Sequence, residues 1–500
     1  MSDSVIKKEN LKVDPAKGEF AKDVLKMASA PLCTQILGVI LMPVITRLYI
    51  PDIYGTFQLY VSIVMPVAVF VCLGYNSSIV LPQKDEVAAN MLIVSLISTV
   101  TITLLTTLLL IFGSQYLLSW LKSPELGRYI WIIPVNVFAH GLYLTLRSWN
   151  VRNRGFSRIA TARIIDSAMN KGVLIGTGLS GLATSGSLIA GRLAGSFSMS
   201  GILGARVWKE HKELFKSSIR WRKILEGIKR YRKFPMYNLW TELLARIATT
   251  VIVFFFSFYF TKKAIGYYSL CVVILSLPMT FIAGSIGEVF YQRGARARHD
   301  GTNSELAEKL FSLMVKLGMF AFFLLAASGD RFFGFVFGSE WAEAGIFAQI
   351  LIFKIFINFI MTPARILTNI LEKQEATLIL NISVIVLSSI SLVIGGKANN
   401  VYIALGLFSL LNGLAGLSFG LYIFRHAGIA LSKIFKILLK CFLSCLPLIS
   451  VILLLKLYFE MSSLSLIIAS AVSCAIYYGI LLKKDKVIQS AISSIFSRSN

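Results

Sequence analysis

Runs of about 20 mostly apolar residues recur along this chain from Leu25 to Leu482, and a helix of that length spans the hydrocarbon core of a bilayer. Helices also satisfy their own backbone hydrogen bonds, as lipid requires. Only 15% of the 500 residues are charged, and the mean hydropathy is +0.73. A soluble chain would carry about a quarter charged residues. The sequence therefore predicts an all-α polytopic membrane protein.

We expect about fourteen transmembrane helices, centred near residues 36, 66, 100, 140, 168, 193, 247, 277, 319, 356, 386, 412, 445 and 472. Residues 1–23 are polar and lack the apolar core of a signal peptide. With the N-terminus in the cytoplasm, the cytoplasmic segments hold about four times as many Lys and Arg residues as the opposite side. The net charge of +25 is therefore attributed mostly to topology, and both termini are predicted to be cytoplasmic.

The longest polar stretch is RVWKEHKELFKSSIRWRKILEGIKRYRKF, residues 206–234, in which aromatic and basic residues alternate. That mixture is compatible with nucleic-acid binding. Apolar residues at helical spacing favour instead an interfacial helix on the anionic cytoplasmic leaflet. No nucleic-acid partner is therefore predicted, and membrane lipids are the expected contact. The stretch follows six predicted helices, as an elbow between two halves would.

The two halves share short patterns. IYGTFQLYVSIVMP, residues 53–66, follows the first predicted helix, and IGYYSLCVVILSLP, residues 265–278, follows the seventh; the best alignment pairs Gly55 with Gly266. Duplicated transporters place their substrate site between the repeats. We therefore predict two pseudo-repeated six-helix lobes around a central cavity. Residues 1–205 would form the N-lobe, 206–234 a basic cytoplasmic elbow, 235–427 the C-lobe, and 428–500 two further helices and a cytoplasmic tail.

Sequence patterns for catalysis are absent. The chain has no GxxxxGK[ST] phosphate-binding loop and no HExxH or clustered Cys/His pattern, so neither a metal nor another cofactor is predicted. The longest predicted external loops, near residues 113–128 and 329–343, are short for an enzyme that acts outside the membrane. The sequence favours movement of a substrate over its chemical conversion.

Charged residues within the predicted helices are the candidate functional groups. Each costs about 2.5 to 3.5 kcal/mol at the bilayer centre on insertion scales, and such residues persist where they face a partner or water. Two acids have local partners at helical spacing, Asp166 with Arg163 and Glu242 with Arg246, and structural pairing is one interpretation. The cations outnumber these acids, so the excess predicts an anion site. The candidate substrate-binding residues are Arg163, Lys171, Arg192, Arg246, Lys316, Lys354 and Arg365, and the candidate ion-coupling acids are Asp166 and Glu242.

Three segments carry a resemblance to a known family. RLYIPDIYGTFQLYVSIVMPVAVFVCLGYNSSIVLPQ (47–83), FPMYNLWTELLARIATTVIVFFFSFYFTKKAIGYYSL (234–270) and FGSEWAEAGIFAQIL (337–351) resemble Wzx-type polysaccharide flippases of the multidrug/oligosaccharidyl-lipid/polysaccharide (MOP) exporter superfamily. The resemblance runs across most of the first twelve helices. It implies an inner-membrane protein that flips undecaprenyl-diphosphate-linked oligosaccharide repeat units for O-antigen or capsule assembly, with a polysaccharide polymerase as a downstream partner.

In this interpretation the two lobes alternate in access, the cations hold the diphosphate, and Asp166 or Glu242 couples transport to H⁺ or Na⁺. Lipid II flippases and multidrug/ion antiporters of the same superfamily are the nearest alternatives. Multidrug exporters generally handle cationic drugs, which an excess of cavity cations disfavours. A membrane polysaccharide polymerase is an alternative of a different class, and the short external loops weigh against it.

Overall fold

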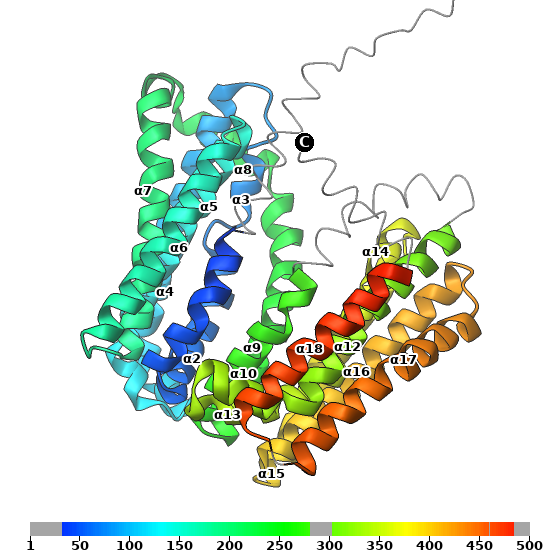
Figure 1. Ribbon diagram of the computed structural model, residues 1–500. Helices are drawn as coiled ribbons and strands as arrows, with labels where there is room; N and C mark the ends of the chain where they lie inside the picture. Colours follow the sequence, from blue (N-terminus) through cyan, green and yellow to red (C-terminus); the bar gives the residue numbers. More distant parts are fainter. Residues whose placement is uncertain (1–32, 281–302, 460, 485–500) are drawn as a thin grey trace, which may run out of the picture.

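The computed structural model describes residues 33–280, 303–459 and 461–484, and the elements in these ranges are helical (Figure 1). In chain order they are Cys33–Leu48, α2 (Pro51–Phe70), α3 (Tyr75–Ser78), α4 (Asp85–Trp120), η1 (Pro124–Arg128), α5 (Ile132–Arg152), α6 (Phe156–Leu179), α7 (Ser185–Ser218), α8 (Trp221–Arg230), η2 (Phe234–Asn238), α9 (Leu239–Tyr259), α10 (Lys262–Leu275), α12 (Asn303–Phe337), η4 (Ser339–Trp341), α13 (Ala342–Ile360), α14 (Thr362–Ile370), α15 (Gln374–Lys397), α16 (Val401–His426), α17 (Leu431–Leu457) and α18 (Ser463–Lys484).

The predicted all-α membrane fold is confirmed. By length and composition, 10 of the described helices can cross a membrane. The other predicted segments are also helical: Cys33–Leu48, α5, α6, and the segment that begins with α10. Helix α6 is less apolar because it carries Arg163, Asp166 and Lys171. The span predicted near residue 277 would extend past residue 280, and that part lies outside the described residues.

Several helix ends differ from the sequence-based expectation. Helix α7 continues through the start of the predicted elbow to Ser218, ending where Ile219 takes an extended conformation. Helices α4 and α12 run to Trp120 and Phe337, so the connections predicted near 113–128 and 329–343 are shorter still. The predicted tenth span is broken between α13 and α14, where Pro363 lies in the first turn of α14. Proline is tolerated there because the first helical N–H groups have no partner within the helix.

One face of helix α8 packs against α4, and the other face is exposed. Its Ile224 is buried, and Gly227 lies against Met91 of α4. Lys223 Nζ is 2.7 Å from Glu86 Oε2 at the start of α4. Trp221 and Leu225 remain exposed beside the basic residues. The predicted amphipathic helix is therefore present, but it is anchored to the first lobe. We call the end of the molecule that carries α8 the basic end.

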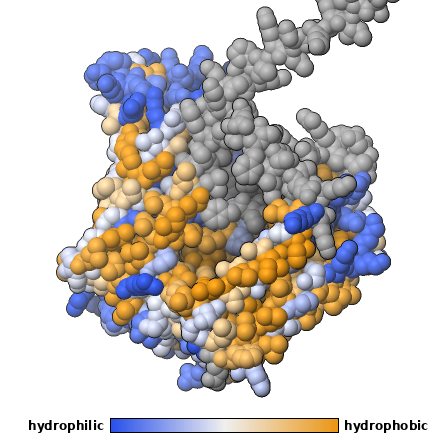
Figure 2. All heavy atoms as spheres, in the orientation of Figure 1, coloured by the Kyte–Doolittle hydropathy of each residue, from blue (hydrophilic) through white to orange (hydrophobic). Residues whose placement is uncertain are grey.

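Two groups of helices pack within themselves and meet along α2, α9 and α10 (Figure 1). In the first group α6 packs along α7 and α4 packs on α5. In the second, α12 packs along α13 and α15 packs along α16. Helices α17 and α18 lie on the outer side of this second group and contact α12. Apolar residues form a broad band over the flank of the molecule, and hydrophilic residues gather towards its ends (Figure 2).

The two groups touch closely at the end opposite α8, which we call the closed end. Helices α2 and α10 cross here at the two glycines that the repeat alignment paired. A Cβ atom at Gly55 would collide with the backbone carbonyl of Lys262, and one at Gly266 with the carbonyl of Pro51. Each glycine therefore contacts the first turn of the other helix. This reciprocal contact is what two related halves would make about a shared axis.

Polar contacts between the two groups reinforce the closed end. Most of them use a backbone carbonyl as the acceptor, so they depend on where the helices lie and not on a matching side chain. They are Trp341 Nε1 to Thr46 O (2.8 Å), Arg47 Nη2 to Phe335 O (3.0 Å), Ser257 Oγ to Leu121 O (2.6 Å), Lys122 Nζ to Phe258 O (3.2 Å), and the ion pair of Lys262 Nζ with Glu125 Oε2 (2.9 Å).

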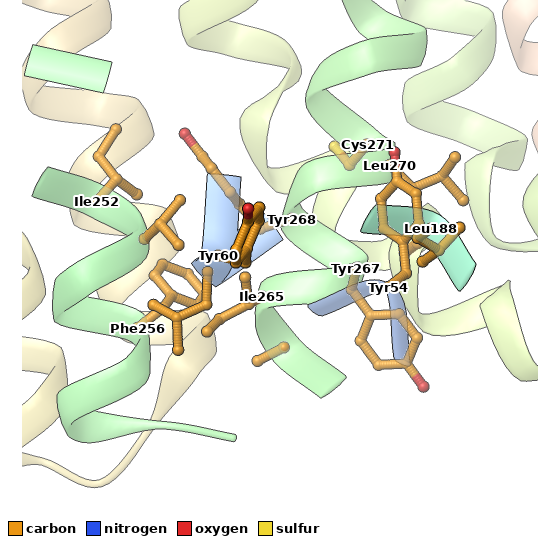
Figure 3. Packing of buried hydrophobic residues seen from close by; sticks show 14 of the residues in the cluster. Tyr54, Tyr60, Leu188, Ile252, Phe256, Ile265, Tyr267, Tyr268, Leu270 and Cys271 are labelled. Carbon is orange, nitrogen blue, oxygen red and sulfur yellow. The ribbon is translucent and has the colours of Figure 1, made fainter. Parts of the chain in front are cut away.

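A buried apolar cluster lies above these contacts. Figure 3 shows Tyr60 of α2 beside Phe256 of α9 and Ile265 and Tyr268 of α10, so residues from both groups share one core. The ring centroids of Phe256 and Tyr268 are 5.3 Å apart. Asn136 Nδ2 of α5 donates to the Tyr60 hydroxyl at 3.3 Å. This cluster forms the floor of the space between the groups on its closed-end side.

Candidate substrate cavity

Two adjacent chambers lie between the groups of helices. The first, which we call the central chamber, has a volume of about 440 Å³ and is lined by α2, α9, α10, α13, α15 and α16. Its polar and aromatic lining residues include Gln58, Arg246, Tyr268, Lys354, Asn358 and Phe408. The chamber is otherwise largely apolar. It therefore offers a few polar groups on an apolar wall, as ligand cavities do.

The second chamber, about 360 Å³, is lined by α2, α3, α5 and α9, and we call it the basic-end chamber. Met65 and Arg246 line both this chamber and the central chamber, so the two are adjacent. Nearby, Phe70 of α2 and Trp240 of α9 meet edge to face at a centroid distance of 6.5 Å. Gly74, with a φ of +74°, lets the turn after α2 lie against Phe234.

Two of the predicted cations line the central chamber on the side of the second group, and a third contacts one of its lining residues. Arg246 lines it, and its Nη2 is 3.8 Å from Glu242 Oε1 one turn earlier, so the predicted local pair is present. Lys354 also lines it, with Nζ 4.1 Å from the ring centroid of Phe408. Arg365 is reached through Asn358, whose Oδ1 accepts from Arg365 Nη2 at 3.0 Å.

Arg192 extends from α7 towards the space between the groups. Helix α7 packs closely on α6 at Gly191 and Gly195, where an added Cβ atom would meet Leu174 and Asp166. Its Nη2 lies 4.0 Å from Met65 Sδ, and Met65 lines both chambers. Arg192 interacts electrostatically with Tyr60 and Asp166 but has no ion-pair contact within the described residues.

The remaining α6 charges gather elsewhere. Arg163, Asp166 and Lys171 line a separate pocket of about 440 Å³ inside the first group, together with Thr34, Gln35 and Tyr143. Asp166 interacts electrostatically with Arg192, Lys171 and Arg163. The local Asp166–Arg163 ion pair considered from the sequence does not form within the described residues. Asp166 is instead shared among several cations on two helices.

Lys316 lies on the side of α12 that faces the added helices. Its carbonyl accepts from the hydroxyl of Tyr477 of α18 at 3.0 Å, and the lysine interacts electrostatically with Cys441 of α17. It is not among the described residues that line the two chambers. The structure thus brings Arg246, Lys354 and Arg192 towards one cavity and sets Lys316 apart.

Sequence reasoning passed over two residues of the basic-end chamber. Arg147 and His140 both project into it from α5. Their spacing of seven residues places them on one helix face, two turns apart. This seven-residue spacing is visible in the sequence. Arg147, however, lies near the end of a predicted helix, where basic residues are common in any membrane-spanning segment. Sequence reasoning also passed over Asp330 of α12, whose Oδ1 is 2.6 Å from Lys456 Nζ of α17.

The charges that line the two chambers favour an anion. The described residues that line them include three cations, Arg147, Arg246 and Lys354, and one acid, Glu242. In surroundings of low dielectric constant, unlike charges attract far more strongly than in water. The chambers can therefore hold a phosphate-type group against several cations while apolar walls contact the rest of a ligand. Within the described residues, no group of His, Cys, Asp and Glu could hold a metal ion.

Two groups of helices that touch at one end around a cavity form a fold that solved flippase and transporter structures share. The structure is similar to "Lipid II flippase MurJ, inward closed conformation", with a TM-score of 0.72, 16% identity, and coverage of 91% of this chain and 98% of that chain. It is also similar to an "inward-facing conformation of a multidrug resistance MATE family transporter of the MOP superfamily", with a TM-score of 0.62, 14% identity, and coverage of 82% and 99%. These likenesses concern the fold.

The particular family follows from the sequence. Residues 44–346, more than half of the chain, match the family described as "Polysaccharide biosynthesis protein". The chain belongs to this family, and the resemblance to polysaccharide flippases of the MOP superfamily is confirmed. No curated protein matches the chain.

Proposed function

We propose that the protein is a flippase that moves undecaprenyl-diphosphate-linked oligosaccharide repeat units across the bacterial inner membrane for O-antigen or capsular polysaccharide assembly. The observation that carries the proposal is the excess of cations around a cavity between two lobes, in a chain of the polysaccharide biosynthesis family. A lipid-linked diphosphate has a charged head that must cross the membrane and a tail that can stay in lipid.

The two ends of the cavity support an alternating-access mechanism. The closed end is held by the Gly55–Gly266 crossing and by contacts to backbone carbonyls. We assign the basic end to the cytoplasm because Lys and Arg residues concentrate there. Both termini would then be cytoplasmic. In this state the cavity would accept the diphosphate and glycan from the cytoplasmic side. Rocking of residues 1–205 against 235–427 about the 206–234 elbow would expose the cavity outward.

We assign the acids Asp166 and Glu242 to the coupling of transport to an ion gradient. Asp166 lies among Arg163, Lys171 and Arg192, and Glu242 lies beside Arg246 at the basic-end chamber. Protonation of either acid, or Na⁺ binding to it, would change the positive charge presented to the substrate. We propose that one of them links transport to an ion gradient.

A lipid II flippase is the second candidate, and the likeness in fold to such a protein favours it. A multidrug/ion antiporter shares the fold but would need a cavity suited to cationic drugs. The two flippase functions differ in the glycan that is attached to the lipid diphosphate. Gene deletion separates them: loss of lipid II flipping would arrest peptidoglycan synthesis, whereas loss of repeat-unit export would remove surface polysaccharide.

The deciding experiment measures lipid-linked intermediates in a deletion strain. We expect complete repeat units on undecaprenyl diphosphate to accumulate on the cytoplasmic side, and the wild-type gene to restore export. Surface display of single unpolymerised units would indicate a polymerase and contradict the proposal. A polymerase that acts on the exported units is the expected functional partner.

A further inference from the structure

The pocket inside the first group of helices, which we call the first-lobe pocket, is lined almost entirely by polar side chains. It has a volume of about 440 Å³ and lies among the helix Cys33–Leu48, α5, α6 and α7. Its described lining residues are Thr34, Gln35, Tyr143, Arg163, Asp166, Ser167, Asn170, Lys171 and Met199, of which Met199 alone is apolar. A polar pocket of this size has room for water. The charged groups of α6 are therefore placed against a hydrated space inside the lobe.

Helix α6 supplies most of the pocket wall from one side. Its lining residues recur at the i, i+3, i+4, i+7, i+8 spacing of a single helix face: Arg163, Asp166, Ser167, Asn170 and Lys171. Ile164 and Met169, which fall between them in the sequence, are exposed apolar residues outside the pocket lining. Helix α6 thus has a continuous polar face turned towards the pocket.

Positive charge exceeds negative charge around this pocket. Asp166 interacts electrostatically with Arg192 of α7 and with Lys171 and Arg163 of its own helix. In the part of the chain that the structure describes, none of these four groups makes an ion-pair contact. Three cations therefore share one acid in surroundings of low dielectric constant, where like charges repel strongly. A bound anion would offset the excess.

The neutral polar groups of the pocket also suit an anion. Gln35, Tyr143, Ser167 and Asn170 can each donate a hydrogen bond, and among the described residues their side chains make none to the protein. Hydrogen bonds to an ionised acceptor are stronger than those between neutral groups. A metal cation in the same place would be repelled by the positive charges that line the pocket.

Depth in the membrane indicates which anion fits. At about 1.5 Å per residue, Arg163 lies about 10 Å and Lys171 about 22 Å from the start of α6 at the basic end. Phospholipid head groups lie outside the hydrocarbon core, which is about 30 Å thick, so they do not reach Lys171. The cost of desolvating an ion is high and grows with its charge, which disfavours phosphate and sulfate.

We propose that the first-lobe pocket binds a small monovalent inorganic anion of the chloride type, with Arg163 and Lys171 as its cationic ligands. This site is independent of the proposed function, and it assigns these two residues to an ion and not to the transported lipid. All of its described lining residues belong to the first lobe, so rocking of the lobes leaves the site intact. The anion then acts as a permanent counter-ion that stabilises two cations inside a membrane-embedded lobe.

The proposal is tested by thermal unfolding of the purified full-length protein in detergent, with sodium gluconate replaced by sodium chloride at constant ionic strength. We expect the Tm of the wild type to rise with chloride concentration, because an ion that binds only the folded protein stabilises it by mass action. Lys171→Met and Arg163→Gln each remove a charge-assisted contact and should weaken the chloride affinity about 10- to 100-fold. Asp166→Asn removes the competing negative charge and should tighten chloride binding.

Lys354→Gln is the matched control, because it removes a cation that lines the central chamber between the lobes. Its chloride response should equal that of the wild type. A wild-type Tm that is the same in chloride and gluconate overturns the proposal. So does a chloride response that survives in Lys171→Met and Arg163→Gln, and a response lost in Lys354→Gln would place the anion between the lobes. Should Lys171→Met fail to fold, Arg163→Gln and Asp166→Asn decide the question, and none of these outcomes bears on the flippase function.

Discussion

A methyl group added at Gly55 should shift the protein towards the state in which the closed end is open. The Cβ atom would overlap the backbone carbonyl of Lys262 in α10, and a carbonyl cannot rotate away as a side chain can. The crossing helices would have to separate by about 1 Å or more to restore van der Waals contact. The perturbation acts only where the two lobes touch.

The magnitude follows from the cost of overpacking. Forcing an extra methyl group into a well-packed contact typically costs about 1 to 3 kcal/mol. This cost falls on the state in which α2 and α10 are in contact and is relieved when they part. A change of that size alters a two-state equilibrium by about 5- to 150-fold. Gly266→Ala should act in the same direction, because its Cβ atom would meet the carbonyl of Pro51.

The assay is the distance between two spin labels at the closed end, one on the first group of helices and one beside α17, which packs against α12 of the second group. Tyr116 of α4 and Tyr458, directly after α17, are both exposed and suit labelling, once the native cysteines have been replaced. We expect Gly55→Ala to broaden or lengthen the distance distribution. Gly172→Ala is the matched control, since a Cβ atom there has nothing within 4 Å. An unchanged distribution for Gly55→Ala, with Gly172→Ala also unchanged, would refute the idea that this crossing governs closure.

Three further predictions concern charged residues. Lys456→Met leaves Asp330 without its ion-pair partner at a site where the Asp330 side chain is about one quarter exposed. It should lower the free energy of unfolding, measured by thermal unfolding, by about 1 to 3 kcal/mol. Adding Asp330→Asn should recover part of this loss. Lys262→Gln breaks a pair whose Glu125 is well exposed, so its effect on stability should be no more than about 1 kcal/mol and should fade in high salt. Asp166→Asn should reduce the dependence of transport on an ion gradient in proteoliposomes; full dependence in this variant would exclude Asp166 as the coupling group.

The hydropathy of the chain was enough to predict the helices. Each predicted segment has a helix in the described structure, including α6, which carries three charges. The residues at which helices end were harder to predict, because a transmembrane helix can continue beyond the bilayer. Helix α7 illustrates this: its polar residues beyond 205 keep helical geometry to Ser218, so composition changes before conformation does.

Pairing between side chains could be predicted only where it is local. The i,i+4 pair of Glu242 and Arg246 was visible in the sequence and forms. Asp166 also has an arginine at helical spacing, Arg163. It nevertheless packs against Gly195 of α7 and interacts electrostatically with Arg192 of that helix. Which helices become neighbours is a property of the tertiary fold, and spacing along one helix carries no information about it.

Because the sequence does not reveal which helices are neighbours, the excess of cations over acids within the helices was easier to predict than the place where those cations gather. Counting acids and cations within spans requires no knowledge of packing, so the excess of cations is found around the two chambers even though Lys316 lies beside α17 and α18. The anion itself stays a prediction. Predicting where an anion would bind requires knowing which cations from different lobes face the same cavity. Arg147 and Arg246 are 99 positions apart in the chain, yet they line one chamber. A cavity between two lobes is built from such distant pairs, because each lobe supplies one wall.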